Sequence, residues 1–120
     1  MKRHLKTHVN RRGACGVIVT EGIVQYWFTV INKAVFSGRI AKPIIIIKEM
    51  RKYVGWCRVK SDGEVHIEIS TQLKQRSPLI ATVAHEMVHI YQFQNFGLMD
   101  HGQIYKDWKK FFKKHYDLTL

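Results

Sequence analysis

Five consecutive residues have the types and spacing of a metal site: His85-Glu86-Met87-Val88-His89, which reads H-E-x-x-H. Residues four apart lie on one face of a helix, so the two histidines can present their imidazole rings to the same ion. Neutral imidazole nitrogens are good zinc ligands. Glu86 lies one step around the helix, where its carboxylate can take a proton from a metal-bound water. The stretch predicts zinc chemistry; the alternative is a helix whose histidines are only hydrogen-bonded.

The residues around this stretch predict a buried helix. Ser77 followed by Pro78 is typical of a helix start, with the serine as N-cap, and Gly97 is typical of a helix end. Between them, apolar residues recur at helical spacing: Leu79, Ile80, Val83, Ala84, Met87, Val88 and Tyr91. Two imidazoles and a carboxylate are costly to bury among such side chains unless something compensates, which favours metal binding.

A catalytic zinc takes three protein ligands and leaves one position for water, so a third ligand is needed. No glutamate follows Glu86, which excludes the thermolysin-type arrangement, and the metzincin pattern would need glycine at Gln92 and histidine at Asn95. The remaining candidates are Asp100, His101, Asp107, His115 and Asp117. We favour His101, because it precedes Gly102 at a junction between a loop and a helix, where the chain can fold back over the first two ligands.

Two more helices are expected around the site. Thr20 can cap the first, with Glu21 in its first turn and Gly38 at its end, and its apolar face is Ile23, Val24, Trp27, Phe28, Ile31, Ala34 and Val35. The last runs from about residue 103 to 115 and buries Ile104, Tyr105, Trp108, Phe111 and Phe112. Its other face carries Lys106, Lys109, Lys110, Lys113 and Lys114. These lysines form either a solvated face or a phosphate-binding surface.

A small, mostly antiparallel sheet is predicted between the first helix and the H-E-x-x-H helix. Its strands are residues 44–48, about 51–59, and 64–70, with a turn at 61–63. The last strand alternates strictly, so we expect Val65, Ile67 and Ile69 to face the core and Glu64, His66 and Glu68 to face away. We also expect its edge to hold an extended substrate by strand addition.

Length and composition indicate one domain: 120 residues with 46% hydrophobic residues. Cys15 and Cys57 form no C-x-x-C pair, and no apolar run is long enough to span a membrane. We therefore expect an intracellular protein, and the charge described next favours one that is cytoplasmic or associated with DNA.

The charge is strongly positive, with 20 Lys and Arg against 9 Asp and Glu, a formal net charge of +11. Residues 1–16 contain five of these basic residues and no acid, which predicts a flexible basic arm ahead of a domain at 17–120. Such a chain is attracted to polyanions, chiefly nucleic acid. We expect contacts with DNA phosphates; charge that only aids solubility is the alternative.

The order of several motifs resembles the SprT-like (Spartan) domain. The motifs, within about residues 20–116, are Phe36-Ser37-Gly38, Gly55-Trp56-Cys57, Ile67-Glu68-Ile69-Ser70, H-E-M-V-H and His101-Gly102. The resemblance implies a zincin-like α+β fold, with His85, His89 and His101 as zinc ligands and Glu86 as the catalytic glutamate. Many members also carry a C-terminal four-cysteine zinc ribbon, which this sequence lacks. Tyr105 stands where the family often has phenylalanine.

The resemblance also implies an activity, because the family includes DNA-dependent proteases that cleave proteins crosslinked to DNA. We predict a minimal zinc metallopeptidase that acts on DNA-bound proteins, with the basic arm and the lysines of the last helix supplying the DNA contacts. One alternative is a nucleic-acid-binding module with a structural zinc and no catalysis. Another is a toxin-like or virus-encoded peptidase with one narrow target.

Overall fold

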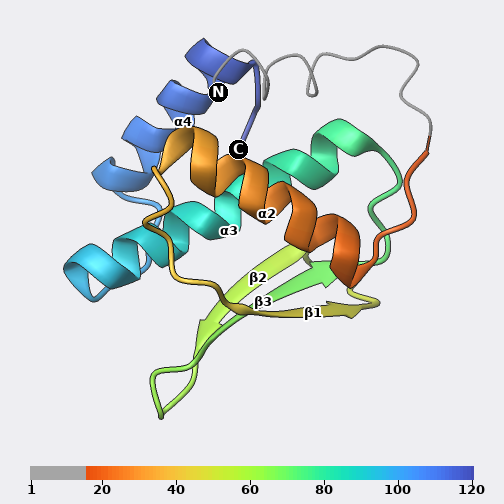
Figure 1. Cartoon of the computed structure of the whole chain (residues 1–120), viewed down its shortest axis with the longest axis horizontal. Coiled ribbons are helices and arrows are strands. Elements are labelled where there is room, and N and C mark those ends of the chain that lie inside the picture. Colours follow the sequence, from red (N-terminus) through yellow and green to blue (C-terminus); the bar gives the residue numbers. More distant parts are fainter. Residues whose placement is uncertain (1–15) are drawn as a thin grey trace.

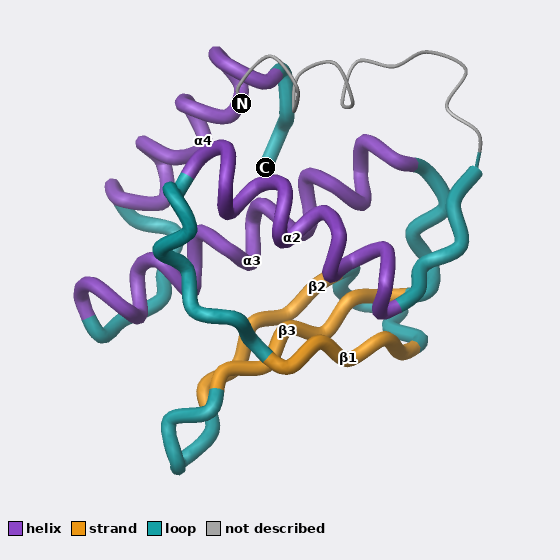
Figure 2. The backbone as a smooth tube through the Cα atoms, viewed as in Figure 1, coloured by secondary structure: helices purple, strands orange, loops and turns teal. Residues whose placement is uncertain are grey.

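The computed structural model describes residues 16–120, which form three helices and a three-stranded sheet (Figure 1). In chain order these are α2 (Glu21–Val35), β1 (Ile44–Lys48), β2 (Gly55–Val59), β3 (Val65–Ser70), α3 (Arg76–Phe96) and α4 (Gln103–Tyr116). The helices lie on one side of the sheet (Figure 2). Helix α2 packs on β1, α3 packs on β2 and β3, and α4 packs on α3. The predicted α+β class is confirmed.

The sheet has the order β1-β3-β2 and is mixed rather than mostly antiparallel. Strands β2 and β3 form an antiparallel hairpin, whereas β1 and β3 are parallel. Strand β3 is therefore central, and the prediction that its edge receives a substrate strand is wrong because both of its edges are already paired. Among the described residues β2 pairs only with β3, so the outer edge of β2 is unpaired. Residues 51–54, expected in β2, precede the strand.

The central position of β3 also changes the burial of its side chains. Ile67 and Ile69 are fully buried, as predicted, but His66 and Glu68 are only 7% and 6% exposed. Both side chains face away from the core as predicted, but they are buried rather than exposed to solvent. Polar neighbours cover them on the sheet face away from the helices: His66 Nε2 lies 2.7 Å from Glu64 Oε1, and Glu68 pairs with a lysine of β1 and an arginine of β2. His66 therefore lies on the opposite face of the sheet from α3.

The helix ends follow the sequence in most respects. Thr20 Oγ1 accepts a hydrogen bond from the Ile23 N–H, which caps α2 as predicted. Gly97, at φ 71°, ends α3 in the left-handed conformation that favours glycine. The start of α3 differs, because Gln75 is its N-cap and Ser77 lies inside the first turn. Ser77 is thus not the cap that the sequence predicted.

The core lies where α2 and α3 meet the sheet, and α4 extends it with Tyr105, Phe112 and Tyr116. The five lysines predicted on the other face of α4 are all exposed. The predicted basic arm, residues 1–16, falls outside the described residues except for Gly16, which bridges to Gln75. Within the described part of the chain, no helix is long and apolar enough to cross a membrane.

Candidate metal centre

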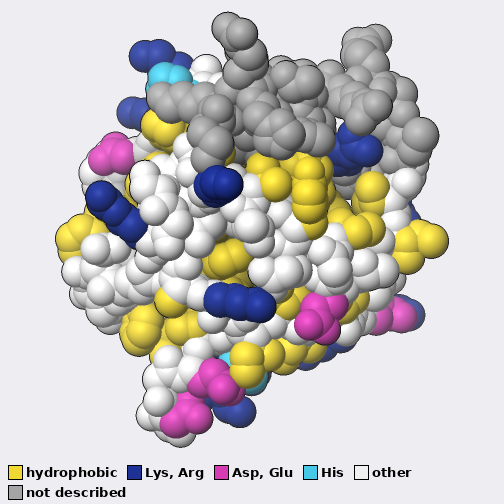
Figure 3. Space-filling model, in the orientation of Figure 1, with side chains coloured by type: hydrophobic (Ala, Val, Ile, Leu, Met, Phe, Trp, Pro, Cys, Tyr) yellow, Lys and Arg dark blue, Asp and Glu magenta, His cyan; other side chains and the backbone are white. Residues whose placement is uncertain are grey.

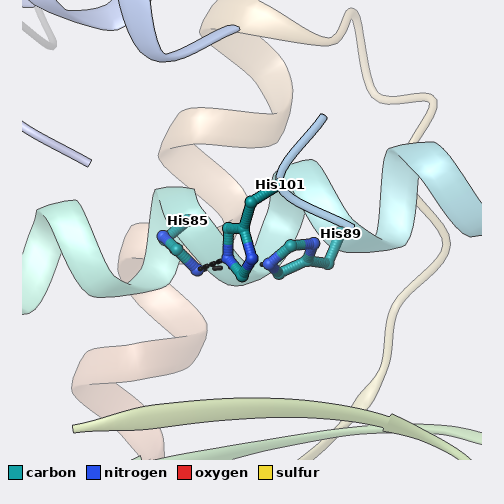
Figure 4. Close-up of side chains that lie close together, drawn as sticks. All are labelled: His85, His89 and His101. Carbon is teal, nitrogen blue, oxygen red and sulfur yellow. Dashed lines mark hydrogen bonds between the residues drawn. The ribbon is translucent and has the colours of Figure 1, made fainter. Parts of the chain in front are cut away.

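Three histidines converge at one point beside α3 (Figure 4). His85 and His89 come from adjacent turns of α3, and His101 comes from the loop between α3 and α4. The Nε2 atom of His85 lies 3.1 Å from that of His89 and 3.4 Å from that of His101. Within residues 16–120 this is the one group of three or more His, Cys, Asp or Glu side chains with ligand atoms within 4.8 Å of one another.

These separations fit a tetrahedral zinc ion. Zinc binds imidazole nitrogen at about 2.0–2.1 Å, and two ligands of a tetrahedron at that distance are about 3.3 Å apart. Asp107, Asp117 and His115, the alternative third ligands on or just after α4, lie outside this group. Asp100 is adjacent but engaged, since its Oδ1 accepts hydrogen bonds from the Gln92 amide and the Gly102 N–H. The residues present can therefore hold a metal ion through the three histidines.

A buried glutamine sets the orientation of His89. Gln92 is fully buried one turn after His89, and its Oε1 lies 2.8 Å from His89 Nδ1. A carbonyl oxygen can only accept, so Nδ1 carries the proton and the lone pair is on Nε2, the atom that faces the other histidines. Gln92 Nε2 in turn donates to Asp100 Oδ1 at 3.1 Å. The glutamine thereby joins one ligand to the loop that carries His101.

Tyr105 of α4 plays the corresponding part for His85. Its hydroxyl oxygen lies 3.0 Å from His85 Nδ1, which leaves Nε2 of His85 directed at the cluster. The Tyr105 ring also stacks on His89, with centroids 5.7 Å apart and planes at 12°, and meets His101 edge-on at 4.7 Å. One aromatic side chain therefore packs against all three histidines and ties them to α4.

Burial favours the neutral, metal-binding form of these histidines. It lowers the pKa of His85 to about 4, with further contributions from the positive charges of His89, His101 and Lys109. Burial also lowers the pKa of His89, against the opposing effect of its hydrogen bond to Gln92. Lone pairs on these rings are therefore available at neutral pH without prior loss of a proton.

Glu86 lies beside the histidines and close to β2. Its side chain is almost fully buried, and desolvation raises its pKa to about 8. Its Oε2 would lie 2.8 Å from a Cβ atom built on Gly55, and the Thr82 methyl would lie 2.6 Å from the same atom. Real Cβ contacts of this length do not occur, so the absence of a side chain at Gly55 lets the strand approach the carboxylate.

The histidines and Glu86 open into a cleft of about 780 Å³ between α3 and the start of β2. Its walls are residues 53–57, one face of α3 from Pro78 to His89, the loop residues 99–101, and residues 119–120. A metal held by three histidines would face this cavity with a coordination position open, which is the arrangement of catalytic rather than structural zinc.

Comparison with protein-family models identifies the SprT-like family over residues 24–119. The chain belongs to the SprT-like family. A search of curated proteins finds no match to the sequence. The matched region includes α3, the His101 loop and α4, so the three histidines and Glu86 all lie within the part shared with the family.

The three histidines predicted from the sequence lie together in the structure, but the sequence did not indicate three residues that support them. The spacing of three between His89 and Gln92 places both on one helix face, and this is the only sequence signal for their contact. The apolar pattern of the last helix predicts that the Tyr105 ring is buried, but the contact of its hydroxyl with His85 carries no sequence signal. Gly55 belongs to one of the motifs that resemble the family, but its close approach to Glu86 depends on the packing of β2 against α3.

Proposed function

We propose that this chain is a zinc-dependent peptidase. The observation that carries the proposal is the convergence of three Nε2 atoms beside the buried carboxylate of Glu86, at the wall of an open cleft. Because three protein donors leave a position for water, catalysis is favoured over the alternative of a structural zinc with four protein ligands.

Bound zinc would polarise the carbonyl of a peptide bond and lower the pKa of a water molecule. Glu86 accepts the proton of that water and delivers it to the nitrogen of the leaving amine. The raised pKa of Glu86 suits the second step, because a carboxyl with a pKa near 8 holds a proton at neutral pH. A nearby cation would lower the pKa of Glu86, so that its carboxylate form is present before the reaction.

The unpaired edge of β2 is the surface on which we place an extended substrate. The Ser70 N–H bonds Val54 O, and the Lys60 N–H bonds Glu64 O. Because pairing alternates along an antiparallel strand, the N–H and C=O groups of Gly55, Cys57 and Val59 point to the outer edge. A peptide that adds there runs past Glu86, and its backbone rather than its sequence supplies most of the binding.

We further propose that the substrate proteins are bound to DNA and that α4 contacts the DNA. The five lysines of α4 are exposed, and the charge of one of them, Lys109, reaches His85. Basic side chains on the face shown in Figure 3 are separated by apolar and polar surface. The lysines of α4, which share one helix face, are therefore the better candidate for contacts with successive phosphates.

The test uses zinc-loaded protein and a fluorescently labelled, denatured protein as substrate. We expect cleavage by the wild type, loss of cleavage with a chelator, and about 10²- to 10⁴-fold slower cleavage by Glu86→Gln. Glu49→Gln, which changes an exposed glutamate outside the cleft, is the matched control. Equal cleavage by Glu86→Gln and Glu49→Gln would refute the proposal.

A second measurement tests the ligands separately from activity. His101→Ala should lower zinc affinity, and His115→Ala should not, because His115 packs beside Phe111 near the far end of α4. If Asp107→Ala released the metal instead, the assignment of His101 would be wrong.

A further inference from the structure

The cleft continues past the histidines toward the start of α3. There its walls are Leu73, Pro78 and Ala81, together with Leu120 from the end of the chain. We refer to these four residues as the apolar compartment. Pro78 and Ala81 occur seven and four residues before His85 on the same helix face, so the compartment begins about 6 Å from that ligand and reaches about 10 Å along the helix axis.

The chemistry of the compartment is aliphatic. Its neighbour Thr82 donates its hydroxyl hydrogen to Pro78 O at 2.7 Å and turns its methyl group toward Gly55. Cys57, on the opposite wall, is an uncharged thiol because burial raises its pKa to about 12. The acidic side chains of the cleft, Glu86 and Asp100, are sequence neighbours of His85 and His101 and lie at the histidine end. The two ends of one cleft thus differ sharply in polarity.

The end of the chain forms one wall of the compartment. Helix α4 stops at Asp117, and the Leu118 N–H bonds Phe112 O at 3.2 Å. Leu118 is 2% exposed and anchors the turn. The following residues run back over α3 (Figure 1), so that Thr119 and Leu120 line the cleft and Leu120 packs against the core.

We propose that the apolar compartment is a specificity subsite that takes one large aliphatic or aromatic side chain of the peptide substrate, close to the scissile bond. This inference rests on the proposed peptidase function. Successive residues of an extended chain advance about 3.3 Å, so a side chain one or two residues from the bond at the histidines reaches the compartment. An extended peptide is the occupant that also satisfies the backbone groups on the adjacent outer edge of β2.

The expected gain in binding affinity follows from the burial of apolar surface. A leucine-sized side chain moved from water into such a compartment should tighten binding about 10- to 100-fold. A charged side chain of similar length gains nothing there and loses its hydration. The enzyme should therefore prefer leucine, methionine or phenylalanine to aspartate or lysine at one position beside the cleaved bond.

The experiment measures binding rather than turnover. Zinc-loaded protein is titrated with acetohydroxamate and with two hydroxamates that carry either an isobutyl or a carboxymethyl group next to the zinc-binding group. We expect the wild type to bind the isobutyl compound at least tenfold more tightly than the other two, so the ratio of its affinity for the isobutyl compound to its affinity for the carboxymethyl compound should be at least ten. Ala81→Phe, which fills the compartment, should bring this ratio close to one while acetohydroxamate still binds.

Two further variants complete the design. Leu120→Asp puts a carboxylate into the compartment from the end of the chain, and should reduce the ratio even if Ala81→Phe does not fold. Ala41→Phe adds the same ring at an exposed position outside the cleft and should keep the wild-type ratio. A wild-type ratio near one, or an unchanged ratio in Leu120→Asp, would overturn the subsite alone. Failure of all three hydroxamates to bind the wild type would overturn the proposed metal centre and the subsite with it.

Discussion

The Nδ1 atom of His89 lies 2.8 Å from Oε1 of Gln92, and the same glutamine reaches Asp100 in the loop that carries His101. The contact determines which nitrogen of His89 faces the other histidines. It also means that one buried amide supports candidate ligands from two different elements. Hydrogen-bond partners of this kind typically change metal affinity by about 10- to 100-fold.

Gln92→Leu should therefore weaken zinc binding by about 10- to 100-fold, because His89 loses its acceptor and Asp100 loses its donor. Gln92→Glu should recover part of the affinity, since a carboxylate oxygen still accepts from Nδ1. The measurement is competition with a chromogenic chelator. Gln25→Leu, on the outer side of α2, is the matched control. Zinc affinity equal to that of the control in Gln92→Leu would show that the glutamine serves only packing.

Gly55→Ala should slow catalysis and leave zinc affinity nearly unchanged. The new methyl group would meet the Thr82 methyl at 2.6 Å and Glu86 Oε2 at 2.8 Å, so the carboxylate or the strand must move. A displacement of about 1 Å at a reacting group can cost on the order of 10²-fold in rate. Gly22→Ala, where the nearest atom is 3.9 Å away, is the control. Peptidase rates and zinc content would both be measured, and wild-type rates in Gly55→Ala would contradict the prediction.

The stability of the metal-free protein should depend on pH through Glu86. Burial raises the pKa of Glu86 from 4.5 to about 8, so the folded state holds a proton that the unfolded state has already released. The stabilising effect of this proton is complete below pH 4.5 and is lost as pH rises to about 8. Each pKa unit corresponds to about 1.4 kcal/mol, so the loss is on the order of a few kcal/mol.

Glu86→Gln cannot ionise and should escape this loss. In chelator-treated samples its free energy of unfolding, relative to the wild type, should increase between pH 5 and pH 8, because only the wild type loses stability there. Histidine ionisation is common to both proteins. Urea unfolding at several pH values measures the difference, and a constant difference across the range would show that Glu86 has an ordinary pKa.

Replacement of Lys109, Lys110, Lys113 and Lys114 by Glu should weaken DNA binding and leave zinc content intact. Each lost phosphate contact should reduce the slope of log affinity against log salt by about 0.7 to 0.9. The control replaces Lys33, Lys42, Lys52 and Lys60 by Glu, which changes the net charge equally at exposed positions elsewhere. Salt titrations of DNA binding on one random-sequence oligonucleotide would compare the α4 variant with the control variant. Equal slopes for the two variants would assign binding to net charge rather than to α4.

Local patterns predicted the elements more accurately than their pairing. The spacing of His85 and His89, the Thr20 cap and the Gly97 stop depend on residues within one helical turn, and the structure agrees with each. The parallel pairing of β1 with β3 joins residues about twenty positions apart, and no local pattern encodes it. The burial of His66 and Glu68 follows from that pairing, because neighbouring strands supply the side chains that cover them.

The contacts that support the candidate metal centre could not be predicted from the sequence for a different reason. The contact of Tyr105 with His85 depends on the angle at which α4 crosses α3, and that of Gly55 with Glu86 depends on the distance between a strand and a helix. Both are fixed by the packing of the whole core. Residue types alone indicated a buried ring at Tyr105 and a strand residue at Gly55, and their contacts with His85 and Glu86 appeared only when the elements were brought together.

The position of His101 makes the predicted metal site depend on the docking of α4. It follows His89 by twelve residues and reaches the cluster only when the loop folds back and α4 docks through Tyr105. A partly folded chain with α3 alone would offer two imidazoles, which hold zinc weakly. If the proposed zinc binding holds, the zinc content of a metal-saturated preparation would report the fraction of chains in which α4 has docked on α3.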